Sequence, residues 1–197
     1  MAVPLVGLTG GIGAGKSEAL RALGELGAAT LSTDAVVHEL LAEPEVRELI
    51  VERLGEQVAP GDEVDRSLVA EHVFGDDEQR GWLEDVLWPR VGQRMLAWKA
   101  EVDATKPPPP AAVVEVPLLF ESGMEGAFDH TVAVVADEDV RERRAAARGH
   151  AAVASRAGRQ LSQREKAERA EFVVRNDGSL DELRQALSRV LGTIGAT

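Results

Sequence analysis

The sequence of 197 residues contains no cysteine and no tyrosine, and aromatic residues make up only 4% of it. The absence of cysteine excludes disulfide bonds and thiolate metal sites, and it fits a reducing compartment. With so few aromatic side chains, the core must be built from aliphatic residues. Hydrophobic residues make up 44% and charged residues 28% of the chain, which is the ordinary balance of a globular domain.

Long hydrophobic runs are also missing. No apolar stretch approaches the roughly 18–20 residues that a membrane span needs, and the N-terminus lacks the basic and apolar regions of a signal peptide. We therefore expect a cytoplasmic protein without membrane contact. The formal net charge is −12, which argues against general binding to nucleic acid. So acidic a protein can bind phosphate groups only where its positive charge is concentrated locally.

The most specific motif is the stretch Gly10-Gly11-Ile12-Gly13-Ala14-Gly15-Lys16-Ser17, which fits the P-loop pattern G-x-x-x-x-G-K-[ST]. Its glycines allow positive φ angles and bring bare backbone close to a polyanion. Successive N–H groups then form an anion-binding nest at the positive end of the following helix. Lys16 is expected to neutralise the β- and γ-phosphates of a nucleotide, and Ser17 to bind Mg²⁺.

The residues around this loop supply the setting that the motif requires. Residues 3–8 predict an apolar strand before the loop, and residues 18–26, with leucines at helical spacing, predict a helix after it. Residues 28–32 predict a second strand, and a helix is predicted from Ala35, with Thr33 or Asp34 near its N-cap. Asp34 has two interpretations: a base or a ligand of a metal-bound water at the carboxyl edge of the sheet, or a simple helix cap.

Residues 44–106 are predicted to form a long, mostly helical insertion after the second strand. Apolar residues recur in it at helical spacing, and a bend or break is expected at Pro89. An insertion at this place suits the binding of the acceptor substrate. We expect it to belong to a single domain that spans residues 1–197.

A third strand is predicted over residues 111–116, because a continuous apolar run is typical of the middle of a parallel sheet. Glu115 is unexpected in such a strand. A buried carboxylate needs a partner, and a metal-bound water or Lys16 would serve. Alternatively, Glu115 lies at the edge of the strand, in water.

Positive charge is concentrated in residues 143–164. This segment contains no acidic residue, but it contains Arg143, Arg144, Arg148, Arg156, Arg159 and Arg164. Guanidinium groups bind phosphate oxygens through paired hydrogen bonds, so we predict that the segment forms a lid over the phosphates. The alternative is a solvated helix face, but such faces usually carry charges of both signs.

The remaining elements complete an α/β pattern. Strands are predicted at residues 130–135 and 171–174, helices at 137–147, 162–170 and 180–191, and a turn at 176–178. The order of elements indicates a three-layer α/β/α sandwich around a five-stranded parallel sheet, of the P-loop kinase type.

Several of these motifs together resemble the dephospho-CoA kinases, a family related in fold to the nucleoside monophosphate kinases. The resemblance covers nearly the whole chain, and its most specific parts are residues 7–17 and Pro117-Leu118-Leu119-Phe120-Glu121. Asp34 before its helix, the pair Arg156 and Gln160, and the Asn176-Asp177-Gly178 turn also match the family. Ser32, Glu18 and Trp88 depart from the family pattern.

The resemblance implies transfer of a phosphoryl group from ATP to the ribose 3′-hydroxyl of dephospho-CoA, the last step of coenzyme A biosynthesis. It implies that Asp34 accepts or orients the hydroxyl proton and that lid arginines surround the transferring group. Dephospho-CoA would be the partner, Mg²⁺ the metal, and the protein a monomer or weak homo-oligomer. The residues expected at the site are Asp34, Lys16, Arg144 and Arg148 for catalysis, Gly11, Ile12, Gly13, Ala14, Gly15, Lys16, Ser17, Arg156 and Asn176 for the nucleotide, and Ser17 for the metal.

Three other functions are compatible with a P-loop. A kinase of the same fold for another acceptor is the nearest, and residues 117–121 and the long insertion favour dephospho-CoA over it. A GTPase-type switch needs D-x-x-G and N-K-x-D motifs, which the sequence lacks. An inactive nucleotide-binding scaffold is disfavoured by the intact Lys16, Ser17 and Asp34.

Overall fold

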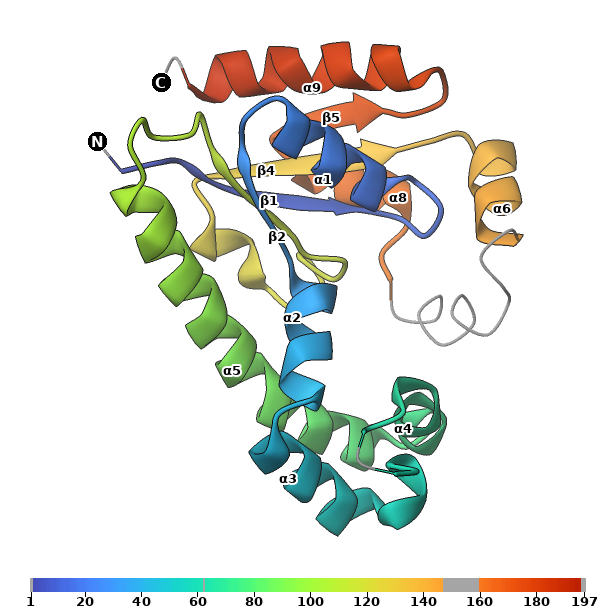
Figure 1. The fold of residues 1–197 in the computed structure, drawn as a ribbon. Helices are drawn as coiled ribbons and strands as arrows, with labels where there is room; N and C mark the ends of the chain where they lie inside the picture. The colour runs from blue at the N-terminus through green and yellow to red at the C-terminus, as the bar shows by residue number, and fades with distance from the viewer. Residues whose placement is uncertain (1, 62, 147–159, 196–197) are drawn as a thin grey trace. The chain divides into compact units, whose positions relative to one another are not determined.

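The protein is described by a computed structural model that covers residues 2–61, 63–146 and 160–195. The chain divides into two compact units, a sheet-bearing unit of Met1–Ser32 and Lys99–Thr197 and a helical unit of Thr33–Trp98. The insertion expected at residues 44–106 overlaps the helical unit. Figure 1 shows the order of the elements along the chain.

The sheet-bearing unit is built on five strands, all paired in parallel and arranged in the order β2-β3-β1-β4-β5. This confirms the predicted α/β fold and its five-stranded parallel sheet. The strand order reverses beside β1, so the loop that follows β1 lies at the place where ligands bind in such sheets. The strands are β1 (Leu5–Gly10), β2 (Ala29–Ser32), β3 (Ala112–Glu115), β4 (His130–Val135) and β5 (Phe172–Arg175).

The register aligns the carboxyl ends of the central strands. Glu115, the last residue of β3, pairs with Leu8 on β1 and with Ser32 at the end of β2. On the other side of β1, Gly10 pairs with Val134 of β4. The P-loop, Glu115 and the chain that continues from Ser32 therefore all start from one edge of the sheet.

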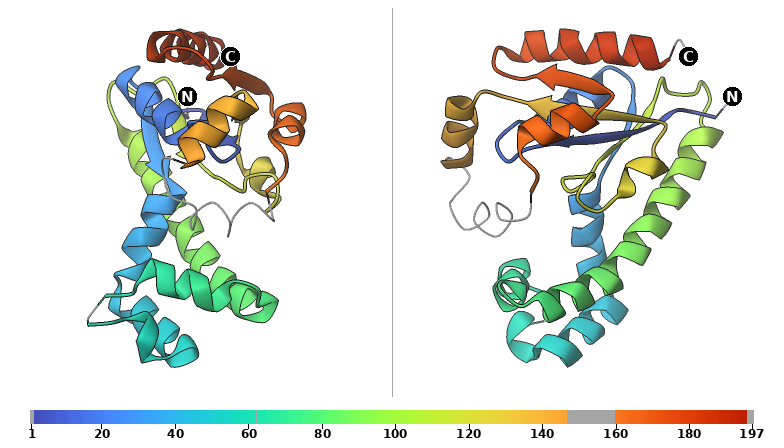
Figure 2. Two further views of the ribbon diagram at one scale, coloured as in Figure 1. Left: turned by 90° about the vertical axis from the view of Figure 1, so that its right-hand side faces the viewer. Right: turned by 180° about the vertical axis from the view of Figure 1, so that it is seen from behind.

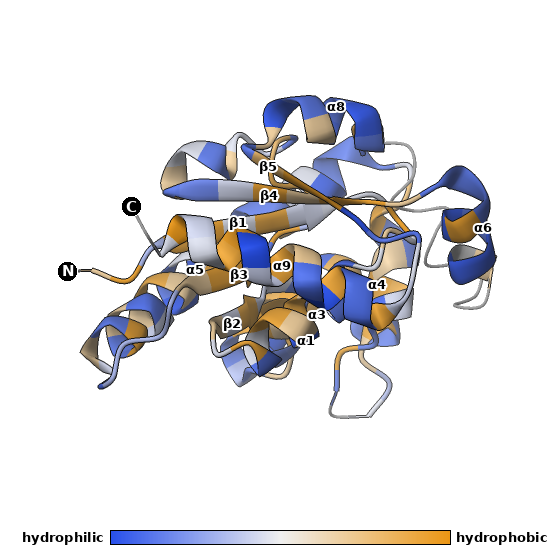
Figure 3. Cartoon of the chain, turned by 90° about the horizontal axis from the view of Figure 1, so that it is seen from above, coloured by the Kyte–Doolittle hydropathy of each residue, from blue (hydrophilic) through white to orange (hydrophobic). Residues whose placement is uncertain are grey.

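Helices cover both faces of the sheet in three layers. On one face, α1 (Lys16–Glu25) and α9 (Leu180–Ile194) enclose the main core, and α8 (Gln163–Arg169) lies on the opposite face (Figure 2). Hydrophilic residues predominate along α8 and along α6 (Glu138–Ala146) (Figure 3). The core is aliphatic, as predicted, and includes Val6, Leu8, Leu23, Val113, Val132, Val134, Leu183, Leu187 and Leu191.

Both C-terminal helices begin with a capping box. Ser162 and Glu165 exchange hydrogen bonds at the start of α8, and Ser179 and Glu182 do so at the start of α9. The Ser179 backbone N–H donates to Glu182 Oε2 over 2.7 Å, and this bond together with the Ser179 hydroxyl holds the pKa of Glu182 below its ordinary value. The local sequence thus sets where α8 and α9 begin.

The helical unit comprises α2 (Thr33–Leu41), α3 (Pro44–Leu54), η1 (Glu56–Val58), α4 (Arg66–Val73) and most of α5 (Asp77–Ala104). All three tryptophans of the chain, Trp82, Trp88 and Trp98, lie in it.

Of the bend or break expected at Pro89, the break does not occur, because α5 is one continuous helix through that residue. Leu87, Val91 and Met95 are buried at intervals of four residues on both sides of the proline. Proline removes one backbone donor and crowds the preceding turn. Burial of these three apolar side chains stabilises a helix that continues past the proline. In the described part of the chain, none of the helices combines the length and apolar character that crossing a bilayer requires.

Candidate active site

The P-loop joins the end of β1 to the start of α1. Gly13 has φ 77° and Gly15 has φ 92°, and Gly15 is the left-handed residue directly before α1. Side chains are strained in this conformation, so both positions favour glycine. A Cβ atom at Gly13 would also lie 2.5 Å from the carbonyl oxygen of Arg141. The glycines predicted to shape the loop therefore do so through backbone conformation and through close packing.

Two predicted site residues hold this loop from the side of β5. The Asn176 Nδ2 donates a hydrogen bond to the Ala14 carbonyl oxygen over 2.9 Å, and Arg144 Nη1 donates to the Asn176 carbonyl oxygen over 3.0 Å. Asn176 is buried, with 5% of its surface exposed. The structure therefore brings Asn176 and Arg144 to the P-loop, and their direct contacts with a nucleotide remain predictions.

Arg141 is a loop contact that the sequence analysis missed. Its Nε donates to the Ile12 carbonyl oxygen over 3.0 Å, and its Nη1 forms an ion pair of 2.8 Å with Glu138. Arg141 stands three residues before Arg144 on α6, so both side chains can lie on one side of the helix. This spacing could have identified Arg141 from the sequence, but the arginine-rich segment was defined as starting at residue 143.

Lys16 and Ser17 occupy the first turn of α1. The Lys16 ammonium donates to the carbonyl oxygens of Gly10 and Gly11 over 3.1 and 3.2 Å. Ser17 Oγ donates to Glu115 Oε1 over 3.5 Å, and Glu115 has only 6% of its surface exposed. The interpretation that places Glu115 at a strand edge in water was therefore wrong, and its carboxylate lies beside the loop.

The oxygens of Ser17 and Glu115 suit a magnesium ion. Mg²⁺ prefers oxygen ligands, keeps several waters, and is usually bound by one or two protein groups together with substrate phosphates. A serine hydroxyl beside a buried carboxylate at the end of a P-loop supplies this kind of donor set.

Asp34 is the second residue of α2, and it follows the last residue of β2 by two positions. Thr33, not Asp34, is the first residue of the helix. A carboxylate in the first helical turn is favourable there because of the helix dipole. As the second residue of the helix, Asp34 is not the cap itself but can still stabilise the first turn, and its catalytic role stays a prediction.

The predicted lid falls mostly outside the described residues. Arg148, Arg156 and Arg159 belong to residues 147–159, so the predictions for these arginines lie outside the described residues. On either side of this segment, Arg143 and Arg144 lie on α6, and Arg164 on α8 pairs with Glu168 over 2.8 Å.

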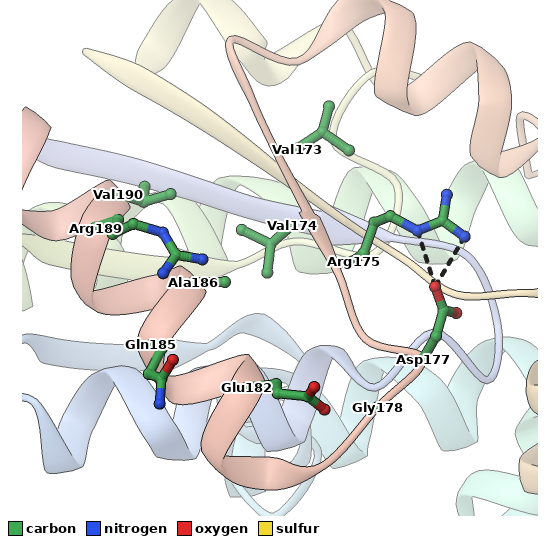
Figure 4. Close-up of a pocket in the computed structure, with 10 residues that line it drawn as sticks. All are labelled: Val173, Val174, Arg175, Asp177, Gly178, Glu182, Gln185, Ala186, Arg189 and Val190. Carbon is green, nitrogen blue, oxygen red and sulfur yellow. Dashed lines mark hydrogen bonds and ion pairs between the residues drawn. The ribbon is translucent and has the colours of Figure 1, made fainter.

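A hollow of the sheet-bearing unit lies between β5 and α9. It is lined by Val173–Arg175, by the turn at Asp177 and by one side of α9 (Figure 4). Arg175 is bonded to Asp177, Nε to Oδ2 over 2.9 Å, at one end of this hollow. None of the P-loop residues lines it, so it is distinct from the candidate phosphate site.

The variant Gly15→Ala should lose ATP binding. A Cβ atom at Gly15 would lie 2.1 Å from the Asn176 amide nitrogen, in addition to the strain of φ 92°. Gly27→Ala is a matched control, since Gly27 has φ 93° but nothing within 4 Å of the added atom. Backbone strain should lower the free energy of unfolding of both variants by about 1–2 kcal/mol. Only Gly15→Ala should fail to be stabilised by Mg-ATP in a thermal melt. Equal responses to Mg-ATP would contradict this packing argument.

Comparison with known proteins identifies the family. A family model for dephospho-CoA kinase matches residues 4–182. Dephospho-CoA kinase of Protochlamydia amoebophila is 39% identical over 187 residues, covering 92% of each chain, and that of Deinococcus radiodurans is 38% identical over 195 residues, covering 98% of this chain and 93% of the relative.

Solved structures agree with this result. The crystal structure of TT1252 from Thermus thermophilus has a TM-score of 0.82 at 34% identity, with 98% of each chain covered. Dephospho-CoA kinase from Campylobacter jejuni has a TM-score of 0.68 at 24% identity, with 98% of this chain and 97% of that chain covered, which supports the fold. The chain whose P-loop, buried Glu115 and parallel sheet are described above belongs to the dephospho-CoA kinase family.

Proposed function

We propose that this protein transfers the γ-phosphoryl group of ATP to the ribose 3′-hydroxyl of dephospho-CoA, giving coenzyme A and ADP. The observation that carries the proposal is the pairing of Ser17 with the buried Glu115 beside a complete P-loop, in a chain of this family. Phosphoryl transfer needs phosphates held in place and their charge neutralised, and these residue types supply both.

The P-loop positions the triphosphate. Backbone N–H groups of residues 11–17 and the positive end of α1 bind phosphate oxygens. Lys16 exchanges the loop carbonyls that it now contacts for oxygens of the β- and γ-phosphates, where its charge opposes the negative charge of the reacting group. Asn176 and Arg144 hold the loop in shape, so that its donors need little rearrangement during the reaction.

Ser17 and Glu115 are the residues of this site that would hold Mg²⁺, Ser17 directly and Glu115 directly or through a water. When bound, the ion neutralises phosphate charge during transfer. Arg144, Arg148 and Arg156 are assigned to the phosphates and the nucleotide, since guanidinium groups suit phosphate oxygens.

Asp34 is assigned to the acceptor hydroxyl. It comes two residues after Ser32, which is in register with Glu115, at the edge of the sheet where parallel α/β folds bind ligands. A carboxylate there accepts or orients the hydroxyl proton as the oxygen attacks phosphorus. The helical unit is assigned to binding the rest of dephospho-CoA, and we assign the enzyme to the cytoplasm, as a monomer or weak homo-oligomer.

The deciding experiment supplies the purified protein with Mg-ATP and one acceptor at a time: dephospho-CoA, adenosine monophosphate or shikimate. Coenzyme A should form, with one ADP per coenzyme A, and omission of Mg²⁺ should stop the reaction. The other two acceptors should not be phosphorylated, and ADP should form with them only at the background rate of ATP hydrolysis. Turnover of adenosine monophosphate with none of dephospho-CoA would overturn the proposal.

A further inference from the structure

A buried lysine outside the P-loop contacts β1 and the segment that follows β3. Lys166 on α8 is fully buried, with 0% of its surface exposed. Its ammonium lies 2.6 Å from the Pro117 carbonyl oxygen, 2.8 Å from Glu121 Oε1 and 3.4 Å from Thr9 Oγ1. The three donors of the ammonium group are thus directed to three acceptors. The mechanism described above does not use this residue.

Its partners stand next to the residues that bind phosphate and metal. Thr9 comes directly before Gly10 on β1, and Pro117 comes two residues after Glu115 at the end of β3. The Thr9 hydroxyl also donates to the Pro117 carbonyl oxygen over 3.4 Å. Lys166 therefore links the residue that precedes the P-loop to the segment that follows Glu115.

The helix that carries Lys166 is itself fixed to the sheet at further points. Gln163 accepts from the Ala136 backbone N–H over 3.1 Å and donates to the Ala136 carbonyl oxygen over 2.7 Å, directly after β4. Glu121 Oε1 accepts from the Leu161 backbone N–H over 2.9 Å. Since β3, β1 and β4 are neighbours in the sheet, α8 contacts the carboxyl ends of its three central strands.

Burying the charged pair of Lys166 and Glu121 costs free energy, because both groups lose most of their contact with water. Burial lowers the pKa of Lys166, and Glu121 opposes that shift through a hydrogen bond and its charge. Apolar side chains of similar volume often stabilise such a position as well or better. What the ammonium supplies, and an apolar group cannot, is a fixed direction for three hydrogen bonds.

We propose that Lys166 is a positioning residue for phosphoryl transfer, which sets the separation between the start of the P-loop and the end of β3 that carries Glu115. Its loss should disturb the Ser17–Glu115 pair, and with it the binding of Mg²⁺ and the rate of transfer. This inference rests on the function proposed above.

The test removes the charges of Lys166 and Glu121 together. In the double variant Lys166→Met/Glu121→Gln no buried charge is left without a partner, and the glutamine still offers an acceptor to the Leu161 N–H. We expect a melting temperature close to that of the wild type. The value of kcat should fall about tenfold or more, because small misplacement of reacting groups is costly. The Mg²⁺ concentration that gives half-maximal rate should rise.

Arg169→Met is the matched control. It makes the same change of a cation to methionine at an exposed position of the same helix, and it should leave both kcat and the Mg²⁺ requirement unchanged. A double variant with the kcat and Mg²⁺ requirement of the wild type would overturn the proposal, since a structural role alone predicts that result.

Thr9→Val keeps the inference testable if the double variant does not fold. It removes only the hydroxyl that Lys166 contacts and keeps the shape of a buried side chain. It should lower kcat and raise the Mg²⁺ requirement, and wild-type values for both would again overturn the proposal. The shift in melting temperature caused by Mg-ATP separates the two proposals, because it needs no acceptor. If the wild type makes no coenzyme A, the proposed function is refuted. The role of Lys166 can still be tested by comparing this shift between the wild type and the Lys166 and Thr9 variants.

Discussion

Lys16→Ala should reduce kcat for the transfer of phosphate to dephospho-CoA by about 10³-fold, with the fold intact. Lys16 is the P-loop cation, and its ammonium already lies within 3.2 Å of two loop carbonyl oxygens. Removing one preorganised charge from a water-excluded site costs several kcal/mol of transition-state stabilisation. Because Lys16 lies in the first turn of a helix, alanine there is compatible with the backbone. Initial rates of coenzyme A formation and a thermal melt measure the two effects separately.

Lys106→Ala is the control for this result. It removes the same charge from an exposed residue of the sheet-bearing unit, so it tests the general effect of making an acidic protein more acidic. We expect its activity to match the wild type. A Lys16→Ala enzyme with ordinary turnover would show that the loop amides suffice and that the role assigned to Lys16 is wrong.

Asp34→Asn should lower kcat by about 10²–10⁴-fold while ATP binds with nearly unchanged affinity. Asparagine keeps the size of the side chain and its place in the first turn of α2, but it cannot take the proton of the acceptor hydroxyl. The measurements are kcat with saturating dephospho-CoA and the Mg-ATP dissociation constant.

Asp85→Asn makes the matching change at an exposed position of α5 in the same helical unit, and it should behave as the wild type. The two interpretations of Asp34 separate clearly here. If Asp34 only stabilises the start of α2, Asp34→Asn should lower the melting temperature slightly and leave kcat unchanged, and the assignment of a catalytic role would then be abandoned.

Local patterns predicted the parts of this protein that depend on nearby residues. The P-loop, the five strands and the helices α8 and α9 follow from short stretches of sequence, whereas the capping boxes at the two helix starts came from the structure. Glu115 could be singled out because a carboxylate is unusual in a buried strand, although its partner could not be chosen. Pro89 shows the limit of local rules, since the buried residues on both sides of it favour a continuous helix.

The contacts that the sequence analysis missed join residues that are far apart in the chain. Arg141 bonds to a carbonyl 129 positions away, and Lys166 bonds to Thr9 across 157 positions. Hydropathy and spacing describe one segment at a time, so they cannot distinguish a buried lysine in a short charged helix from a solvated one. Only the order of strands in the sheet brings such pairs together.

The placement of the tryptophans gives this enzyme a built-in spectroscopic reporter. With no tyrosine in the chain and all three indole rings in the helical unit, intrinsic fluorescence observes that unit alone. Emission spectra therefore report on the folding of the unit that contains Asp34. The sheet-bearing unit contains the P-loop and Lys166, and it gives no indole signal. Far-ultraviolet circular dichroism reports on both units, so the two methods together can tell which of them unfolds first.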